Sequence, residues 1–149
     1  MSVRFQVTID CHDARRLVSF WSSALHYQPE PPPRGFAGWR EYWLSMGVAE
    51  EDVRGVTSPE SIVDPKGEGP RIWFHAVPEA KICKNRLHFD IKASGDRELP
   101  LATRKDQVEA EATRLENLGA ARLETLHEEG VDHYGVAMAD PEGNEFDIN

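Results

Sequence analysis

Residues 140–149 read Asp140-Pro141-Glu142-Gly143-Asn144-Glu145-Phe146-Asp147-Ile148-Asn149, and this stretch is the clearest indicator of the fold. Asp-Pro-x-Gly predicts a tight turn, because proline fixes its own φ and glycine accepts a positive φ. The residues after the turn alternate, so that Glu145 and Asp147 share one face of a short strand while Phe146 and Ile148 share the other. The pattern indicates a strand that is polar on one side and packed on the other.

A second strand of this kind is predicted around His88. Apolar and polar residues alternate there, with Leu87, Phe89 and Ile91 on one face and His88, Asp90 and Lys92 on the other. A histidine and a carboxylate are therefore expected on the polar faces of two strands whose other faces are apolar.

The chain divides into two similar halves. In the first half, residues 5–11 alternate as a strand with Phe5 and Cys11 on the apolar face, and a helix follows with Asp13 as its N-cap and apolar positions between 17 and 25. In the second half, the His88 strand is followed by a helix over about 102–118, which Gly119 ends. Its inner stripe is predicted to be Val108, Ala112, Leu115 and Leu118. Superposing the halves sets Gln6 against His88.

Short strands follow each helix, at 71–77 in the first half and at about 122–126, 135–139 and 145–148 in the second. The predicted fold class is α+β, with two βαβββ modules that form curved mixed sheets around a cavity on their polar face. We expect one domain over 1–149, with module 1 at about 1–80 and module 2 at about 85–149.

Residues 28–66 have no counterpart in the second half. This stretch is rich in proline and glycine at 29–35, carries the aromatic residues Trp39, Tyr42 and Trp43, and becomes acidic with a short helix expected near 49–53. One interpretation is a loop and helix that cover the mouth of the cavity. The other is that its aromatic side chains are core or dimer contacts.

Composition excludes several classes of protein. A net charge of −9 repels phosphate backbones, so nucleic-acid binding is not expected, although the acidity would suit a cationic ligand. No apolar run approaches the roughly 20 residues of a membrane span, and the first residues lack a signal-peptide core, so we expect a cytoplasmic protein. Cys11 and Cys83 are too isolated for a thiolate zinc site or a disulfide framework.

Four segments resemble the signatures of one family, in the family's order. They are Ser19–Leu25, Phe74–Glu79, Lys84–His88 and Asp140–Phe146. On these segments the chain resembles the glyoxalase/bleomycin resistance/dioxygenase group, or vicinal oxygen chelate superfamily, and within it the glyoxalase-like branch.

The resemblance implies up to four metal ligands, which fall on Gln6, His75, His88 and Glu145, with Glu145 also a catalytic carboxylate. Such a mixed nitrogen and oxygen sphere suits Ni²⁺, Co²⁺, Mn²⁺, Fe²⁺ or Zn²⁺, and no organic cofactor is implied. Gln6 stands where dioxygenase-like relatives carry histidine. A shift of two residues would put Trp73, which cannot coordinate a metal, in place of His75.

Other polar and aromatic residues are candidates for substrate binding. They are Trp39, Trp43, Trp73, Asp90, His133 and Asp147. Of these, His133, Asp90 and Asp147 are also candidate acids or bases, as is Tyr134.

Three functions remain open. The first is a divalent-metal lyase or isomerase, or a dioxygenase-type enzyme, acting on a substrate with vicinal oxygens. The second is a metal-free protein that sequesters a ligand, as bleomycin-resistance proteins do. The third is an interaction module with a vestigial cavity. The resemblance also implies a homodimer that binds a small molecule.

Overall fold

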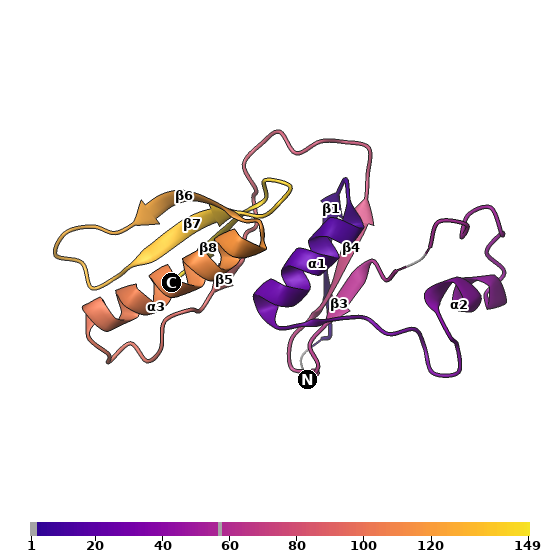
Figure 1. Cartoon of the computed structure of the whole chain (residues 1–149), viewed down its shortest axis with the longest axis horizontal. Coiled ribbons are helices and arrows are strands. Elements are labelled where there is room, and N and C mark those ends of the chain that lie inside the picture. Colours follow the sequence, from indigo (N-terminus) through magenta and orange to yellow (C-terminus); the bar gives the residue numbers. More distant parts are fainter. Residues whose placement is uncertain (1–2, 57) are drawn as a thin grey trace. The chain divides into compact units, whose positions relative to one another are not determined.

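The computed structural model describes residues 3–56 and 58–149. Met1, Ser2 and Thr57, the last of these in the 28–66 stretch, lie outside the described residues. The chain forms two compact units, which we call the first unit (up to Pro78) and the second unit (Glu79–Asn149). Each unit has its own helix packed on its own sheet (Figure 1).

The first unit contains a four-stranded mixed sheet. Its elements are β1 (Gln6–Cys11), α1 (Ala14–Leu25), β2 (Gln28–Pro29), α2 (Trp39–Ser45), β3 (Ser61–Val63) and β4 (Arg71–Ala76). The strand order is β1-β4-β3-β2, in which β1 and β4 run parallel and the other neighbours run antiparallel.

The second unit repeats this topology. Its elements are β5 (Asp90–Ile91), α3 (Leu101–Leu118), β6 (Ala121–Leu126), β7 (Gly135–Ala139) and β8 (Glu145–Ile148). The order is β5-β8-β7-β6, with β5 and β8 parallel. The predicted α+β class with two βαβββ modules is confirmed, and α2 is an insertion into the first module. None of the helices among the described residues combines the length and apolar character of a membrane span.

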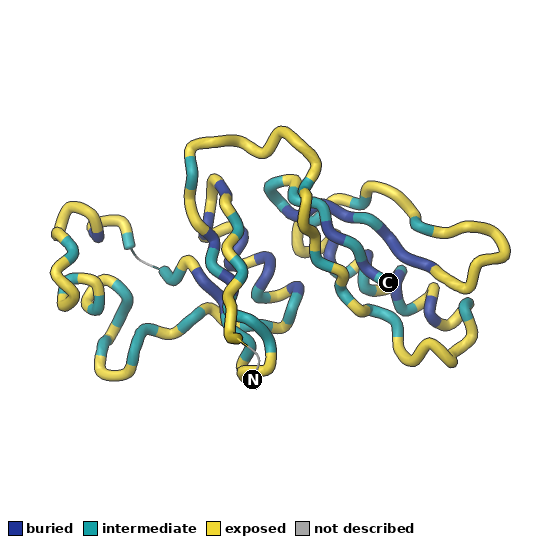
Figure 2. Tube along the Cα trace, turned by 180° about the vertical axis from the view of Figure 1, so that it is seen from behind, coloured by how far each residue is buried: buried dark blue, intermediate teal, exposed yellow. Residues whose placement is uncertain are grey.

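In the first unit, α1 packs its apolar face on the sheet. Leu17, Trp21, Ile62 and Phe74 are each at most 2% exposed. The helix begins where predicted, because the side chain of Asp13 accepts a hydrogen bond of 3.0 Å from the backbone N–H of Arg16. Figure 2 shows this core as the buried stretches of helix and sheet, whereas the segment between β2 and β3 is mostly exposed or half-buried.

In the second unit, the buried stripe of α3 is displaced from the predicted one. Arg104 is buried together with Val108, Ala112 and Leu115, whereas Leu118 is 36% exposed. Arg104 can be buried because its guanidinium is satisfied: Nε donates to the carbonyl oxygen of Leu99 at 3.0 Å, and Nη2 pairs with Asp132. The prediction of Leu118 in the stripe was wrong, because the stripe extends toward the N-terminus of the helix instead.

The Asp-Pro-x-Gly turn occurs twice in the chain. Asp64 precedes β4 in Asp-Pro-Lys-Gly as Asp140 precedes β8 in Asp-Pro-Glu-Gly, and the two glycines, Gly67 and Gly143, have φ of +71° and +85°. Each aspartate accepts a backbone hydrogen bond of 2.9 Å from its glycine and caps following N–H groups with its carboxylate. The two modules therefore share a hairpin as well as a topology.

Hairpin register shows which residues correspond between the modules. Ile62 and Met138 both stand two residues before the turn aspartate, and they pair with Ile72 and Phe146 respectively. Ile72 therefore corresponds to Phe146, and Trp73 to Asp147. On the other side Trp73 pairs with Thr8 and Asp147 with Asp90, so Thr8 corresponds to Asp90 and, two residues earlier, Gln6 to His88.

Replacing Gly143 by alanine is expected to lower the free energy of unfolding by about 1 kcal/mol. The added Cβ meets no atom within 4 Å, so the cost comes from the positive φ of +85° and not from a clash. Gly67→Ala, at the corresponding turn, is expected to cost a similar amount. Chemical denaturation measures both, and a stabilised Gly143→Ala protein would show that the turn does not need a positive φ.

Three local predictions were wrong. Phe5 and Leu87, expected on packed faces, are 73% and 88% exposed, because β1 begins at Gln6 and β5 at Asp90, after these residues. The short helix expected near 49–53 is a run of turns. The helix of this stretch is α2, which begins after Gly38 and carries Trp39, Tyr42 and Trp43.

Candidate functional site

The second unit gathers one histidine and two carboxylates on the polar face of β5 and β8. His88 Nδ1 lies 3.1 Å from Asp90 Oδ1 and 3.6 Å from Asp147 Oδ2. One ligand atom from each of the three residues falls within a span of 4.8 Å. Their side chains are between 26% and 48% exposed, so the cluster is open to solvent and to small ligands.

Glu145 has different partners. Its Oε2 accepts hydrogen bonds of 2.9 Å from the backbone N–H of Asn85 and from Lys81 Nζ. These two bonds, the Asn85 N–H first, lower the pKa of Glu145 to about 2. Asn85 also bonds to β8 through its side chain, whose Oδ1 accepts from the Glu145 N–H at 3.2 Å. The hydrogen bonds between Glu145 and Asn85 thus hold the segment before His88 against the start of β8.

The first unit has its own histidine–carboxylate pair. His75 Nδ1 lies 3.0 Å from Asp10 Oδ1, and the two residues pair directly across β1 and β4. The His75 ring also lies beside the Trp73 ring, with centroids 4.8 Å apart. By register, Trp73 corresponds to Asp147 and Arg71 to Glu145, so the choice between His75 and Trp73 as the ligand position stays a prediction.

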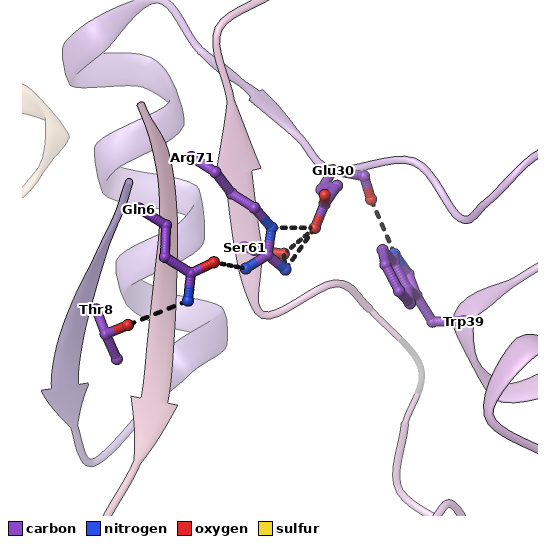
Figure 3. A network of polar contacts seen from close by, with 6 residues as sticks. All are labelled: Gln6, Thr8, Glu30, Trp39, Ser61 and Arg71. Atoms are coloured by element: carbon purple, nitrogen blue, oxygen red, sulfur yellow. Dashed lines mark hydrogen bonds and ion pairs between the residues drawn. The ribbon is translucent and has the colours of Figure 1, made fainter. Parts of the chain in front are cut away.

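Gln6 belongs to a polar network on the same sheet (Figure 3). Its Oε1 accepts a hydrogen bond of 2.9 Å from Arg71 Nη1. Arg71 Nε and Nη2 donate to Glu30 Oε2 at 2.9 and 2.7 Å, and Nη2 also donates to Ser61 Oγ at 2.9 Å. Four of the five N–H groups of the guanidinium are thereby engaged.

The network keeps Glu30 ionised. Partial burial acts to raise the pKa of Glu30, but hydrogen bonds from Arg71 and Ser61, together with the charge of Arg71, outweigh it and lower the pKa. The positive charge of Arg71 is consequently balanced within the unit. The backbone oxygen of Glu30 accepts from Trp39 Nε1 at 2.9 Å, which ties the start of α2 to this network.

Beside the network, a cavity of about 90 Å³ lies between α2 and the sheet of the first unit. Its walls include three indoles, from Trp39 and Trp43 on α2 and Trp73 on β4. The Trp39 and Trp43 rings are stacked, with centroids 5.8 Å apart. Glu60, Ser61 and Arg71 supply polar groups to the same cavity.

The remaining candidates lie elsewhere in the second unit. The carbonyl oxygen of His133 lies 2.9 Å from His127 Nδ1, which is a contact of the loop before β7. The hydroxyl of the buried residue Tyr134 donates to Glu109, whose carboxylate also pairs with Arg122 at 3.0 Å. Neither His133 nor Tyr134 belongs to the His88 cluster.

Sequence reasoning named the histidines, the two aspartates of the His88 cluster, Glu145, Gln6 and the three tryptophans, but it missed several of their partners. Arg71 and Glu30, which organise the polar network, were missed because one opens a strand and the other lies in a proline-rich segment. The signal that points to Arg71 is its pairing with Gln6 in the β1–β4 register, and this register becomes visible once the duplicated Asp-Pro-x-Gly turn is recognised.

Comparison with known proteins identifies the family. The family model described as "Glyoxalase-like domain" matches residues 6–149. The chain therefore belongs to the glyoxalase-like domain family. A search of curated proteins found no match.

Solved structures share the fold at low identity. A glyoxalase/bleomycin resistance protein/dioxygenase family enzyme from Burkholderia phytofirmans PsJN is 16% identical, with a TM-score of 0.59 over 97% of this chain and 94% of that chain. A mutant of the fosfomycin resistance protein FosX from Listeria monocytogenes, complexed with Mn(II) and 1S,2S-dihydroxypropylphosphonic acid, is 9% identical, with a TM-score of 0.62 over 100% and 90%. The oxidase ChaP-H2 is 15% identical, with a TM-score of 0.53 over 99% and 93%.

Proposed function

We propose that the protein is a small-molecule-binding glyoxalase-like protein that depends on a divalent metal, held in the second unit by His88, Asp90 and Asp147. An enzyme of the lyase or isomerase kind is the activity that such a centre would serve. The observation that carries the proposal is the convergence of the imidazole and two carboxylates within 4.8 Å. That the protein works as a cytoplasmic homodimer stays a prediction from the sequence.

The two carboxylates favour a cation between them. Asp90 and Asp147 pair directly across β5 and β8, and like charges at such positions repel each other. His88 Nδ1 contacts both, so these atoms are arranged around a shared positive charge. A bound divalent ion would supply that charge.

The donor set also fits the type of metal. One nitrogen and two carboxylate oxygens suit Mn²⁺, Fe²⁺, Co²⁺, Ni²⁺ or Zn²⁺ and leave positions for a ligand with adjacent oxygens. A bound ion would supply Lewis acidity toward such oxygens. Asp147 takes the role that the family resemblance assigned to Glu145, because the Glu145 carboxylate is already held by Lys81 and Asn85.

Within this site the residues of the chain have separate tasks. His88 and the two aspartates would hold the metal ion near the ligand. A carboxylate oxygen of either aspartate that does not bind the ion can accept a proton from the ligand. Glu145 positions the backbone that leads to His88 and takes no part in binding. In this assignment Glu145 is a positioning residue.

The test is calorimetric titration of untagged, chelator-treated protein with Mn²⁺, Co²⁺, Ni²⁺ and Zn²⁺. At least one ion is expected to bind at a single site. Asp147→Asn and His88→Ala should each weaken that binding by at least tenfold, because each removes a ligand atom. Glu145→Gln should weaken it less, because it removes the ion pair with Lys81 but keeps an oxygen that can accept from Asn85.

The chain offers a matched control. Asp10 contacts His75 as Asp90 contacts His88, but the register places Trp73 and not a second carboxylate beside that pair. Asp10→Asn should therefore leave metal affinity within about twofold. Absence of a tight site in the parent protein, or equal losses from Asp10→Asn and Asp147→Asn, would contradict the proposed ligand set.

A metal-free ligand-sequestering protein is the second candidate. The observation that favours it is the tryptophan-lined cavity of the first unit, which contains no histidine and whose polar groups are already hydrogen-bonded in part. Binding of a small molecule in the presence of a chelator, by a protein that shows no tight metal site, would support this function and not the first one.

A further inference from the structure

We propose that the cavity between α2 and the sheet of the first unit is a binding site for an organic cation with an aromatic or methylated head group. The inference goes beyond the metal function, because every residue that carries it belongs to the first unit and none is a proposed metal ligand. The evidence is the set of walls, the balance of charge around them and the size of the cavity.

The walls supply aromatic faces from two different elements. Trp39 and Trp43 come from α2, and Trp73 comes from β4. Indole is the aromatic side chain that attracts cations most strongly, through the negative potential over its ring face. None of the residues of α2 is buried, and Trp43 is 38% exposed, so these rings are not explained by core packing. One exposed and two half-buried indoles that line a cavity indicate a ligand surface.

The charge around the cavity is negative on balance. Arg71 lines it, but its guanidinium is bound to the carboxylate of Glu30, so this pair contributes no net charge. Glu60 also lines the cavity, and among the described residues no ion pair involves its carboxylate. A cavity wall that contains the acidic residue Glu60 and three tryptophans is complementary to a ligand that carries a positive charge on an apolar body.

The size of the cavity restricts the ligand. Apolar cavities of about 150 Å³ accept a benzene-sized ring, and this one offers about 90 Å³ and opens to solvent. A head group such as a trimethylammonium or the end of one ring therefore fits, with the rest of the molecule outside. An anion would instead have to compete with Glu30 for Arg71, which already donates three hydrogen bonds to Glu30 and Ser61.

The experiment compares three probes that share a phenyl ring, in the presence of a chelator so that no metal contributes. They are benzyltrimethylammonium, benzyl alcohol and benzoate, titrated by calorimetry and by tryptophan fluorescence. The cation is expected to bind at least tenfold more tightly than the other two and to lose affinity as salt rises. Equal affinities for the cation and the alcohol, or tighter binding of benzoate, would overturn the proposal.

Variants then locate the site. Glu60→Gln should weaken cation binding about three- to tenfold and leave benzyl alcohol unchanged, and Trp43→Ala should weaken it at least tenfold. Glu51→Gln, at an exposed glutamate of the same unit that does not line the cavity, removes the same charge and should have less than a twofold effect.

Two outcomes would contradict the proposed site. If Glu51→Gln weakened binding as much as Glu60→Gln, the attraction would come from the general acidity of the protein, and the site would be wrong. If Trp43→Ala kept full affinity while circular dichroism showed it folded, the indoles would not be the binding surface. Cation binding is measured in the absence of metal and depends on residues of the first unit. A failure of the metal proposal would therefore leave these results unchanged, and the two proposals are tested independently.

Discussion

Replacing Asp140 by alanine is expected to lower the free energy of unfolding by about 3 kcal/mol. Asp140 is 4% exposed, and its carboxylate accepts hydrogen bonds of 2.9 Å from the backbone N–H groups of Glu142 and Asn144 and of 3.0 Å from Asn144 Nδ2. Alanine leaves these donors without their acceptor in a place that water does not reach easily. Urea denaturation of the parent and the variant measures the loss.

The corresponding turn provides the control. Asp64 accepts backbone hydrogen bonds from Lys66, Glu68 and Gly69, at 2.8 to 2.9 Å, but it is more exposed than Asp140. Asp64→Ala should therefore cost less, because water can replace the carboxylate there. Equal costs at the two turns would show that burial of Asp140 does not determine its contribution. Asp140→Ala should also weaken metal binding, because the turn sets the β7–β8 register that places Asp147.

Replacing Glu30 by alanine is expected to lower the free energy of unfolding by about 2 kcal/mol. The change removes the acceptor for Arg71 Nε and Nη2 and for the hydroxyl of Ser61, which is 3% exposed. Because the Glu30 side chain is 21% exposed, the loss should be smaller than that from a fully buried ion pair. Thermal and urea denaturation at neutral pH give the value.

This contribution should depend on pH in a definite direction. The pKa of Glu30 is lowered from its ordinary value of 4.5, so the folded state binds a proton less readily than the unfolded state does. Its stabilisation is present above about pH 4.5 and is lost as pH falls through the folded pKa. Stabilities of the parent and Glu30→Gln should therefore converge in acid. A constant difference down to pH 2 would contradict the assignment.

Much of the fold could be predicted because pattern and structure obey the same local rules. The alternation at 145–148 predicted β8 to the residue, and Asp13 and Gly119 mark the helix ends where expected. The burial of Arg104 could not be predicted from the helical pattern. It depends on Asp132 and on the carbonyl oxygen of Leu99, which both lie outside the helix. The same holds for α2, whose aromatic rings contact one another and whose Glu41 carboxylate accepts a hydrogen bond of 2.7 Å from the backbone N–H of Ala37.

For the candidate site, the sequence could predict only which face of each strand carries the polar side chains. Alternation places Glu145 and Asp147 on one side of β8 and cannot say which of them approaches His88. Lys81 and Asn85 decide this by holding the Glu145 carboxylate, and both lie at least 60 positions earlier in the chain. The network around Arg71 depends in the same way on Glu30, which is 41 positions away.

The duplicated hairpin separates the residues that hold the fold from those that give it chemistry. Ile72 and Phe146 point into their cores at equivalent positions, as the two turn aspartates occupy equivalent corners. The outward neighbours are unrelated: Trp73 in one copy and Asp147 in the other. Because these outward positions lie outside the buried core, the two hairpins of one chain present different chemistry, an indole in the first unit and a carboxylate in the second.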